Sequence, residues 1–352
     1  MMKQTMALGL GALLFCAAAA EAQEKITWRM TTYVPENSAL YTHMTLPLVK
    51  WVGLMTDGAV EIQPFPAGVI VPGGNCFDAV VDGLADACQA PTSILFGKNP
   101  ANAPLGQIPG GMGPDALFQW INGGGGAEIL AGHHRESFGL HTLVAGIGGT
   151  EIFAHSHKPI RTPEDLVGLR IRTSGAAGTL MAEYFKGAPV TVPGDELYSM
   201  MERKAIDAAE WAGPADNVIK GLHETAKYII FPGVHGKSYI QGFSVKKEAW
   251  DALSDELKVK IEAAARLATL DSMIGLDRVD IEAWKKLKAG GNEFVEVDPS
   301  LVEAYRKAGR EWATKIAAEQ TAKGDPWMEK AATSYYAFYD DWINNAEFRA
   351  VD

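Results

Sequence analysis

Residues 197–211, LYSMMERKAIDAAEW, combine a short helical pattern, a turn and a strand that ends in a glutamate and a tryptophan. Residues 77–90, FDAVVDGLADACQA, show the same order, with equal spacing from the helix to the aspartate of the strand. Helices that alternate with strands in this way are typical of α/β domains with a largely parallel sheet. This internal repeat predicts two related α/β halves in which Gln89 and Glu210 occupy equivalent strand ends. A chance similarity between two Ala-rich units is the alternative.

The strand end at Glu210 and Trp211 is unusual, because turns after strands favour small residues. Here a charge and a large ring precede the rigid turn Gly213-Pro214, within IDAAEWAGPADN (206–217). In open α/β sheets, ligands bind in the crevice beyond the carboxyl ends of the strands. Two such ends that face each other predict a binding cleft between the halves.

The rest of the chain supports a division into two domains. A strand pattern at 25–34 precedes an amphipathic helix and a second strand, and a Gly/Pro-rich passage separates this unit from a new start near residue 150. The length after residue 22 suits two domains of ordinary size. We expect domain I to comprise residues 23–148 and 238–275, and domain II residues 149–237 and 276–352.

A helical period continues across residues 254–289. Ser254 can cap its start, acidic residues suit its first turn, and Gly290 can end it. A helix of about 36 residues would be about 54 Å long, more than the width of one domain. We expect one helix shared by both domains; two helices broken at Gly275 are the alternative.

The N-terminus has the features of a secretory signal peptide. Lys3 precedes an apolar run from Met6 to Ala20, and small residues predict cleavage after Ala22. We therefore expect residues 1–22 to be removed and the mature protein to work in the periplasm. A net charge of −11 argues against nucleic acid and anionic lipid as partners, but not against a small anion in a pocket with its own local charges.

Two cysteines, Cys76 and Cys88, follow the predicted leader. In an oxidising compartment such a pair can form a disulfide. Two small core residues are the equal alternative, because a disulfide depends on the separation of the Cα atoms.

Taken together, the leader, the two halves, the long helix and the strand end DAAEW resemble the substrate-binding proteins of TRAP (tripartite ATP-independent periplasmic) transporters. The likeness is strongest from residue 169 to residue 236, where LRIRTSGAAG precedes the acidic strand end and FPGVHG follows it. The EW variant looks most like the branch that binds 2-oxo and 2-hydroxy monocarboxylates with a metal ion. The resemblance implies an α/β periplasmic binding protein fold with two domains and a hinge. It also implies a receptor, not an enzyme, that delivers a small organic acid to membrane permease subunits.

The resemblance assigns roles to particular residues. Arg172 matches the arginine that binds the ligand carboxylate, and its planar guanidinium suits two parallel hydrogen bonds to a carboxylate. Arg170 lies on the same face of the strand, so spacing alone does not exclude it. Glu210 and Trp211 match metal and ligand positions, the tryptophan through its main-chain carbonyl and its ring.

Glu151, in GGTEIFAHS, departs from the branch, which usually carries Gln at the matching position. With Arg172 positive, and Glu151, Glu210 and a monocarboxylate negative, a dry cleft would hold two excess negative charges. Ca²⁺, which favours carboxylate and carbonyl oxygens, would balance them, whereas Na⁺, the other candidate ion, would not. We expect Glu151, Glu210 and Trp211 to hold the ion. Alternatively, Glu151 contacts a larger or cationic ligand instead of an ion.

Four further residues are candidates for ligand contact, although each can equally be structural. They are His235 in the loop PGVHG, Tyr33 after the first strand, Met112 in IPGGMG, and Gln89.

Near the C-terminus, four residues are spaced as the apolar face of a helix, and the resemblance implies that this face can pack on a second subunit, in a homodimer, as in some members of the branch. The four residues are Tyr335, Phe338, Trp342 and Ile343.

Two other functions compete with a TRAP receptor. A binding protein of an ATP-driven importer is the first, and a single unbroken long helix would argue against it. A periplasmic enzyme is the second, and turnover of 2-oxo acids by the pure protein would support it.

Overall fold

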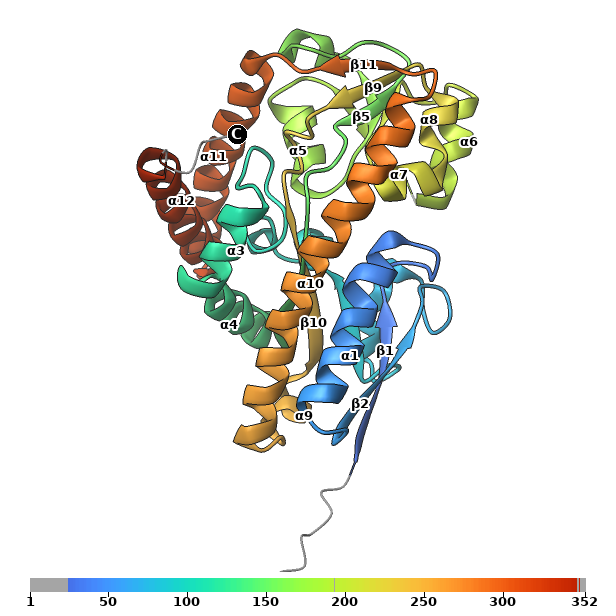
Figure 1. Ribbon diagram of the computed structural model, residues 1–352. Helices are drawn as coiled ribbons and strands as arrows, with labels where there is room; N and C mark the ends of the chain where they lie inside the picture. The colour runs from blue at the N-terminus through green and yellow to red at the C-terminus, as the bar shows by residue number, and fades with distance from the viewer. Residues whose placement is uncertain (1–24, 193, 347, 349–352) are drawn as a thin grey trace, which may run out of the picture.

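The computed structural model describes residues 25–192, 194–346 and 348, so the predicted signal peptide at 1–22 lies outside the described residues. Two α/β halves are crossed by the long helix α10 (Figure 1). The helices are α1 (Leu46–Met55), α2 (Cys76–Val81), α3 (Pro114–Gly123), α4 (Gly126–Phe138), α5 (Gly175–Glu183), α6 (Leu197–Glu202), α7 (Pro214–Lys220), α8 (Leu222–Thr225), α9 (Lys247–Asp251), α10 (Asp255–Lys288), α11 (Pro299–Ala322) and α12 (Trp327–Asn345).

The first half is built on a five-stranded sheet of order β2-β1-β3-β10-β4. β1 runs parallel to β2 and β3, whereas β10 runs antiparallel to β3 and β4. The strands are β1 (Ile26–Thr32), β2 (Val60–Phe65), β3 (Ala87–Pro91), β4 (Leu140–Gly148) and β10 (Tyr239–Lys246).

The second half is built on a six-stranded sheet of order β11-β9-β5-β8-β6-β7. β6 runs parallel to β7 and β8, and β5 runs antiparallel to β8 and β9. The strands are β5 (Ala154–Ser156), β6 (Arg170–Arg172), β7 (Ala188–Val190), β8 (Ala208–Ala209), β9 (Tyr228–Phe231) and β11 (Glu293–Glu296).

The sheets are mixed rather than largely parallel as predicted. The chain leaves the first half after β4 and enters the second through β5, then returns through β10 after β9. Because β5 and β10 arrive from the other half, they run against their neighbours β8 and β3.

The internal repeat predicted from the sequence is confirmed by equivalent contacts in the two halves. Arg29 donates from its backbone N–H and its Nε to Asp86, at 2.9 and 3.0 Å. Arg170 donates from the same two groups to Asp207, at 3.1 Å each. These clamps precede the parallel pairs β1–β3 and β6–β8. The strand end that carries Glu210 therefore has an equivalent in the first half.

The long helix α10 is continuous over 34 residues. The Ser254 side chain caps it by accepting the Leu257 N–H at 3.3 Å, as predicted. Gly275 does not break it: a Cβ at that position would lie 2.6 Å from Nδ1 of His43, so a glycine allows close packing there. The helix contacts α1 and β4 in the first half and α7 in the second. It therefore spans both halves, and the alternative of two helices is wrong.

The C-terminal helices α11 and α12 pack together, and α12 lies against α3 and α4 of the first half (Figure 1). Tyr335, on the predicted dimer face, is buried, with its ring 5.1 Å from that of Trp120. Its hydroxyl also accepts the Met112 N–H at 2.6 Å. Much of this apolar face therefore covers the chain's own core, although Ile343 is 43% exposed.

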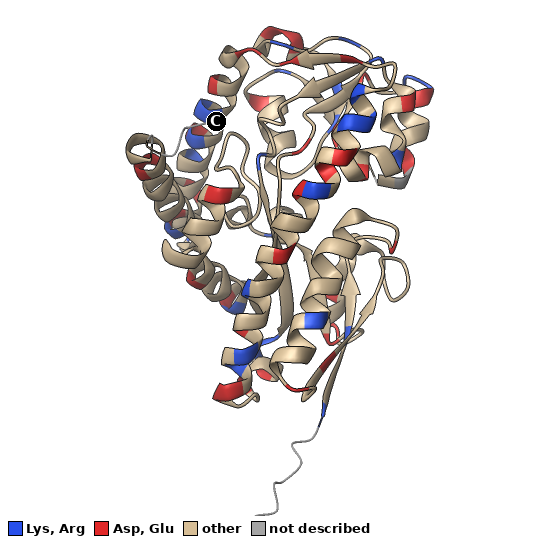
Figure 2. Cartoon of the chain, viewed as in Figure 1, with Lys and Arg blue, Asp and Glu red and all other residues tan. Residues whose placement is uncertain are grey.

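A disulfide joins Cys76, at the start of α2, to Cys88 in β3, with the Cα atoms 5.5 Å apart. The described part of the chain contains no helix that is both long and apolar enough to span a membrane. Lys and Arg are interspersed with Asp and Glu over both halves (Figure 2).

Candidate functional site

Four predicted residues come together where strands of the second half end. Arg172 is the last residue of β6, and Glu210 directly follows β8. Glu151 lies between β4 and β5, and His235 lies between β9 and β10. All four are buried, with at most 8% of each residue exposed.

Arg172 and Glu210 meet because their strands are parallel neighbours with ends at the same edge. Nη1 of Arg172 donates to the main-chain oxygen and to Oε1 of Glu210, both at 3.0 Å. Nε of Arg172 is buried and has no hydrogen-bond partner among the described residues. A buried guanidinium N–H without an acceptor is costly, so this side of Arg172 is suited to a carboxylate brought by a ligand.

His235 lies between the two acidic side chains. Its Nε2 is 3.1 Å from Oε2 of Glu151 and 3.8 Å from Oε2 of Glu210. Burial opposes a charge on the imidazole, yet the hydrogen bond to Glu151 and the negative charges of both glutamates outweigh it and raise the pKa of His235 to about 9. His235 is therefore an internal cation of the cluster rather than a bystander.

The two carboxylates are not equivalent. Burial raises the pKa of Glu151, although hydrogen bonds from His235 and Gln107 oppose the shift. Burial also acts on Glu210, but the positive charges of Arg172 and His235 prevail and lower its pKa. Glu210 is thus the more firmly ionised of the pair.

The loop that carries His235 is shaped around Glu151. The Glu151 N–H donates to the Gly236 oxygen at 2.9 Å. A Cβ on Gly236 would lie 2.6 Å from Oε2 of Glu151, and a Cβ on Gly233 would lie 2.2 Å from its main-chain oxygen. Both glycines of PGVHG therefore let the backbone approach the acid closely.

The acidic group could hold a metal ion. One potential ligand atom from each of Glu151, Glu210 and His235 lies within 4.8 Å of the others. Two carboxylates suit a hard cation such as Ca²⁺, while a nitrogen ligand is more usual for transition metals. The donor set therefore fits an ion held by the two glutamates, with His235 hydrogen-bonded beside them.

The charge count made from the sequence omitted His235. With His235 and Arg172 positive, and Glu151 and Glu210 negative, the cluster is neutral before any ligand enters. A monocarboxylate then adds one excess negative charge instead of two. Na⁺ therefore balances the charge of the site if His235 keeps its proton, and Ca²⁺ balances it if His235 loses that proton.

Trp211 forms a wall beside the cluster. Its ring lies 5.2 Å from Cζ of Arg172 and 4.6 Å from Nζ of Lys220. A Cβ on Gly194 would come within 2.4 Å of this ring, so the segment before α6 packs closely over it. The tryptophan ring thus lies close to two cations, which its negative face attracts.

Of the three remaining candidates for ligand contact, one lies near the cluster and two do not. Tyr33 is close enough to the cluster for the charges of Arg172, Glu210 and Glu151 to act on it, although burial is the main cause of its raised pKa. The Gln89 side chain instead donates to the Met44 oxygen at 3.2 Å inside the first half. Met112 packs in the apolar core and is 1% exposed. The structure thus brings Tyr33 near the cluster, while Gln89 and Met112 make their contacts elsewhere.

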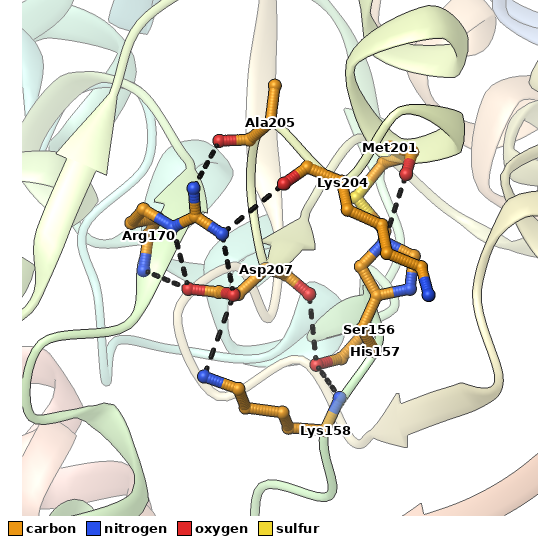
Figure 3. A network of polar contacts seen from close by, with 8 residues as sticks. All are labelled: Ser156, His157, Lys158, Arg170, Met201, Lys204, Ala205 and Asp207. Atoms are coloured by element: carbon orange, nitrogen blue, oxygen red, sulfur yellow. Dashed lines mark hydrogen bonds and ion pairs between the residues drawn. The ribbon is translucent and has the colours of Figure 1, made fainter.

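Arg170 lies at the opposite end of β6. Figure 3 shows its guanidinium bound to Asp207 and to the main-chain oxygens of Lys204 and Ala205. Strand register explains the difference, because Arg172 is paired with Ala209, next to Glu210. Arg170 is therefore occupied in a structural network.

Gln107 is a residue of the cluster that the sequence did not suggest. Its Nε2 donates to Oε1 of Glu151 at 2.9 Å. It lies in the Gly/Pro-rich passage between β3 and α3, where no local pattern marks it. A cavity of about 380 Å³ lies between α3, α10 and α12, and none of the cluster residues lines it.

Comparisons with known proteins show the family to which the chain belongs. The family DctP, bacterial extracellular solute-binding protein family 7, matches residues 30–320. A monocarboxylate 2-oxoacid-binding periplasmic protein of Nostoc sp. is 31% identical over 282 residues, which cover 80% of this chain and 77% of the relative.

Two solved structures show the same fold. A TRAP transporter solute-binding protein of Bordetella bronchiseptica, a dimer with copurified calcium and picolinate in one active site, is 28% identical, with a TM-score of 0.82 over 93% of this chain and 95% of that one. One from Pseudoalteromonas atlantica, with sodium and pyruvate bound, is 24% identical, with a TM-score of 0.82 over 93% of this chain and 100% of that one. The chain belongs to bacterial extracellular solute-binding protein family 7, the solute-binding proteins of TRAP transporters.

Proposed function

We propose that this protein captures a 2-oxo monocarboxylate together with a metal ion between its two halves and delivers it, in the periplasm, to TRAP permease subunits. The observation that carries the proposal is the buried Arg172, whose Nε lacks an acceptor, beside the acidic pair Glu151 and Glu210. An anion and a cation bound together would satisfy both groups.

The ligands of two relatives support this class of substrate. The Nostoc relative binds monocarboxylate 2-oxoacids, and the Bordetella protein holds picolinate with calcium. Both kinds of molecule carry a donor atom on the carbon next to the carboxylate. Such a molecule can offer two atoms to one metal ion and still present its carboxylate to Arg172.

Each residue of the cluster has a distinct part. Arg172 would bind the carboxylate, and Glu210 and Glu151 would hold the ion, with the Trp211 main-chain carbonyl as a further oxygen ligand. His235 and Gln107 fix the orientation of Glu151 through their hydrogen bonds. When bound, the ion supplies a positive charge that draws together the ligand and the two acids. Ca²⁺ remains the expected ion because the donors are mainly carboxylate and carbonyl oxygens.

Family membership decides between the competing functions. The chain is a solute-binding protein of TRAP type, not an enzyme. This argues against both alternatives, a binding protein of an ATP-driven importer and a periplasmic enzyme. A homodimer through the exposed part of α12 remains a prediction, which light scattering of the purified protein would test.

Calorimetric titration of pyruvate into the mature protein tests the proposal. We expect binding in buffer with Ca²⁺ and a marked loss of affinity in buffer with a chelator and no sodium. Full affinity in metal-free buffer would contradict the metal site. Absence of binding to pyruvate and to larger 2-oxo monocarboxylates would contradict the proposed ligand.

A further inference from the structure

The sequence AGPADN (212–217), directly after Glu210 and Trp211, is not used by the ligand site, yet it contains a buried acid. Asp216 lies in the first turn of α7 and is 6% exposed. Its Oδ1 accepts a hydrogen bond of 2.7 Å from the hydroxyl of Ser38. Ser38 is also buried and follows β1, so this bond connects the two halves.

The contact extends to the backbone of the first half. The Leu40 N–H donates to Oγ of Ser38 at 3.1 Å. The backbone N–H groups of Ala39 and Leu40 also act on the Asp216 carboxylate, where they oppose the rise in its pKa caused by burial. A single carboxylate of the second half thus accepts a hydrogen bond from the Ser38 hydroxyl and lies near backbone N–H groups of the first half.

Asp216 is fixed to the same turn as the ligand-site residues. The Ala215 N–H donates to Oδ1 of Asp280 on α10 at 2.7 Å. The Asn217 side chain donates to the Gly213 oxygen at 2.9 Å, which closes the turn after Trp211. The position of Asp216 therefore follows that of the strand end that carries Glu210 and Trp211.

We propose that Asp216 is a positioning residue for ligand capture, whose hydrogen bond to Ser38 holds the two halves in their closed arrangement without touching the ligand. This inference rests on the proposed function of ligand capture between the halves. A hydrogen bond weakens once its atoms separate by more than a few tenths of an ångström. Any opening that moves α7 away from residues 38–40 would therefore break it.

A contact made only in the closed arrangement has a specific thermodynamic effect. It lowers the free energy of the closed state, and the apparent affinity for a ligand scales with the fraction of protein in the competent state. A contact that only stabilised the fold would instead raise the free energy of unfolding of the ligand-free protein, and its removal would lower that free energy. The two roles can therefore be separated by experiment.

The test compares Asp216→Asn, Ser38→Ala and wild-type protein, with pyruvate and Ca²⁺ as the probe. We expect Asp216→Asn to weaken binding roughly tenfold, about 1.4 kcal/mol, and Ser38→Ala to weaken it less. The change should be in the dissociation rate, because closure retains a ligand that has already bound. The double variant should lose less than the sum of the two single losses, since both remove one bond.

Asp115→Asn is the matched control. Asp115 also lies in the first turn of a helix that begins with Gly-Pro, but it is exposed and belongs to α3. It should leave the affinity for pyruvate unchanged. The free energy of unfolding without ligand should be similar for all variants.

The outcomes separate this inference from the proposed function. Wild-type protein that binds neither pyruvate nor a larger 2-oxo monocarboxylate would overturn the proposed function and, with it, this inference. Wild-type binding with unchanged affinity in Asp216→Asn would overturn only the inference, as would a loss confined to the free energy of unfolding. If Asp216→Asn does not fold, Ser38→Ala decides by the same criteria.

Discussion

Replacement of Arg172 by alanine should remove most of the affinity for a 2-oxo monocarboxylate. The guanidinium is buried and binds the Glu210 carboxylate, while its Nε is left for the ligand. Removal of one partner from a buried, hydrogen-bonded charge pair costs about 2–5 kcal/mol. The dissociation constant should therefore rise between about 30-fold and several thousandfold.

A graded variant separates charge from geometry. Arg172→Lys keeps the positive charge but loses the planar fork that can make two parallel hydrogen bonds. We expect its affinity to lie between that of wild-type protein and that of Arg172→Ala. Calorimetric titration with pyruvate in Ca²⁺-containing buffer measures all three proteins under the same conditions.

Arg170→Ala is the matched control, two residues earlier on the same strand. Arg170 binds Asp207 at the far end of β6, so its removal should lower the free energy of unfolding and leave ligand affinity within a few-fold. A folded Arg172→Ala protein with nearly wild-type affinity would refute the assignment. An equal loss of affinity in Arg170→Ala would show that the effect is not specific to the ligand site.

Three further predictions follow from the same geometry. Glu210→Gln should lower the affinity for pyruvate and the affinity for Ca²⁺ together, because each ligand stabilises the other's site; independent changes in the two affinities would contradict this linkage. Glu151→Gln should shift the ion preference of the site from Ca²⁺ toward Na⁺. Saturating ligand should close the halves about hinges near Gly148 and Lys237, and an unchanged radius of gyration in small-angle scattering would count against a hinge. Burial, followed by the charges of neighbouring aspartates, raises the pKa of Asp280 from 3.8 to about 7, so the folded state keeps a proton that the unfolded state releases. The free energy of unfolding should therefore fall as pH rises from about 4 to about 7, by at most about 4 kcal/mol. Denaturant titrations of wild-type protein and Asp280→Asn test this; if both showed the same pH dependence, Asp280 would not be its cause.

The sequence alone was sufficient to predict those features of the structure that depend on local interactions. The cap at Ser254 and the helical period after it predicted the long helix, because capping and helix packing act over three or four residues. Equal spacing in two helix–turn–strand units predicted the repeated halves. The strand end predicted Glu210 as a ligand-site residue, because an α/β sheet presents its ligand groups there, whereas Arg172 was predicted from the resemblance to the family.

Other features depend on contacts between distant segments, which no local pattern records. His235 acquires its role only because the fold places it beside Glu151, 84 residues away in sequence, and Gln107 reaches the same acid from the first half. Gly275 suggests a break in the helix when only the sequence is considered, but in the structure His43 packs closely against it, which favours a residue without a Cβ. Arg170 and Arg172 share one face of a strand, and only the register with β8 assigns the first to Asp207 and the second to Glu210. Tertiary structure decides such cases because burial and the nearest charge, not the residue type, set whether a side chain is structural or available to a ligand.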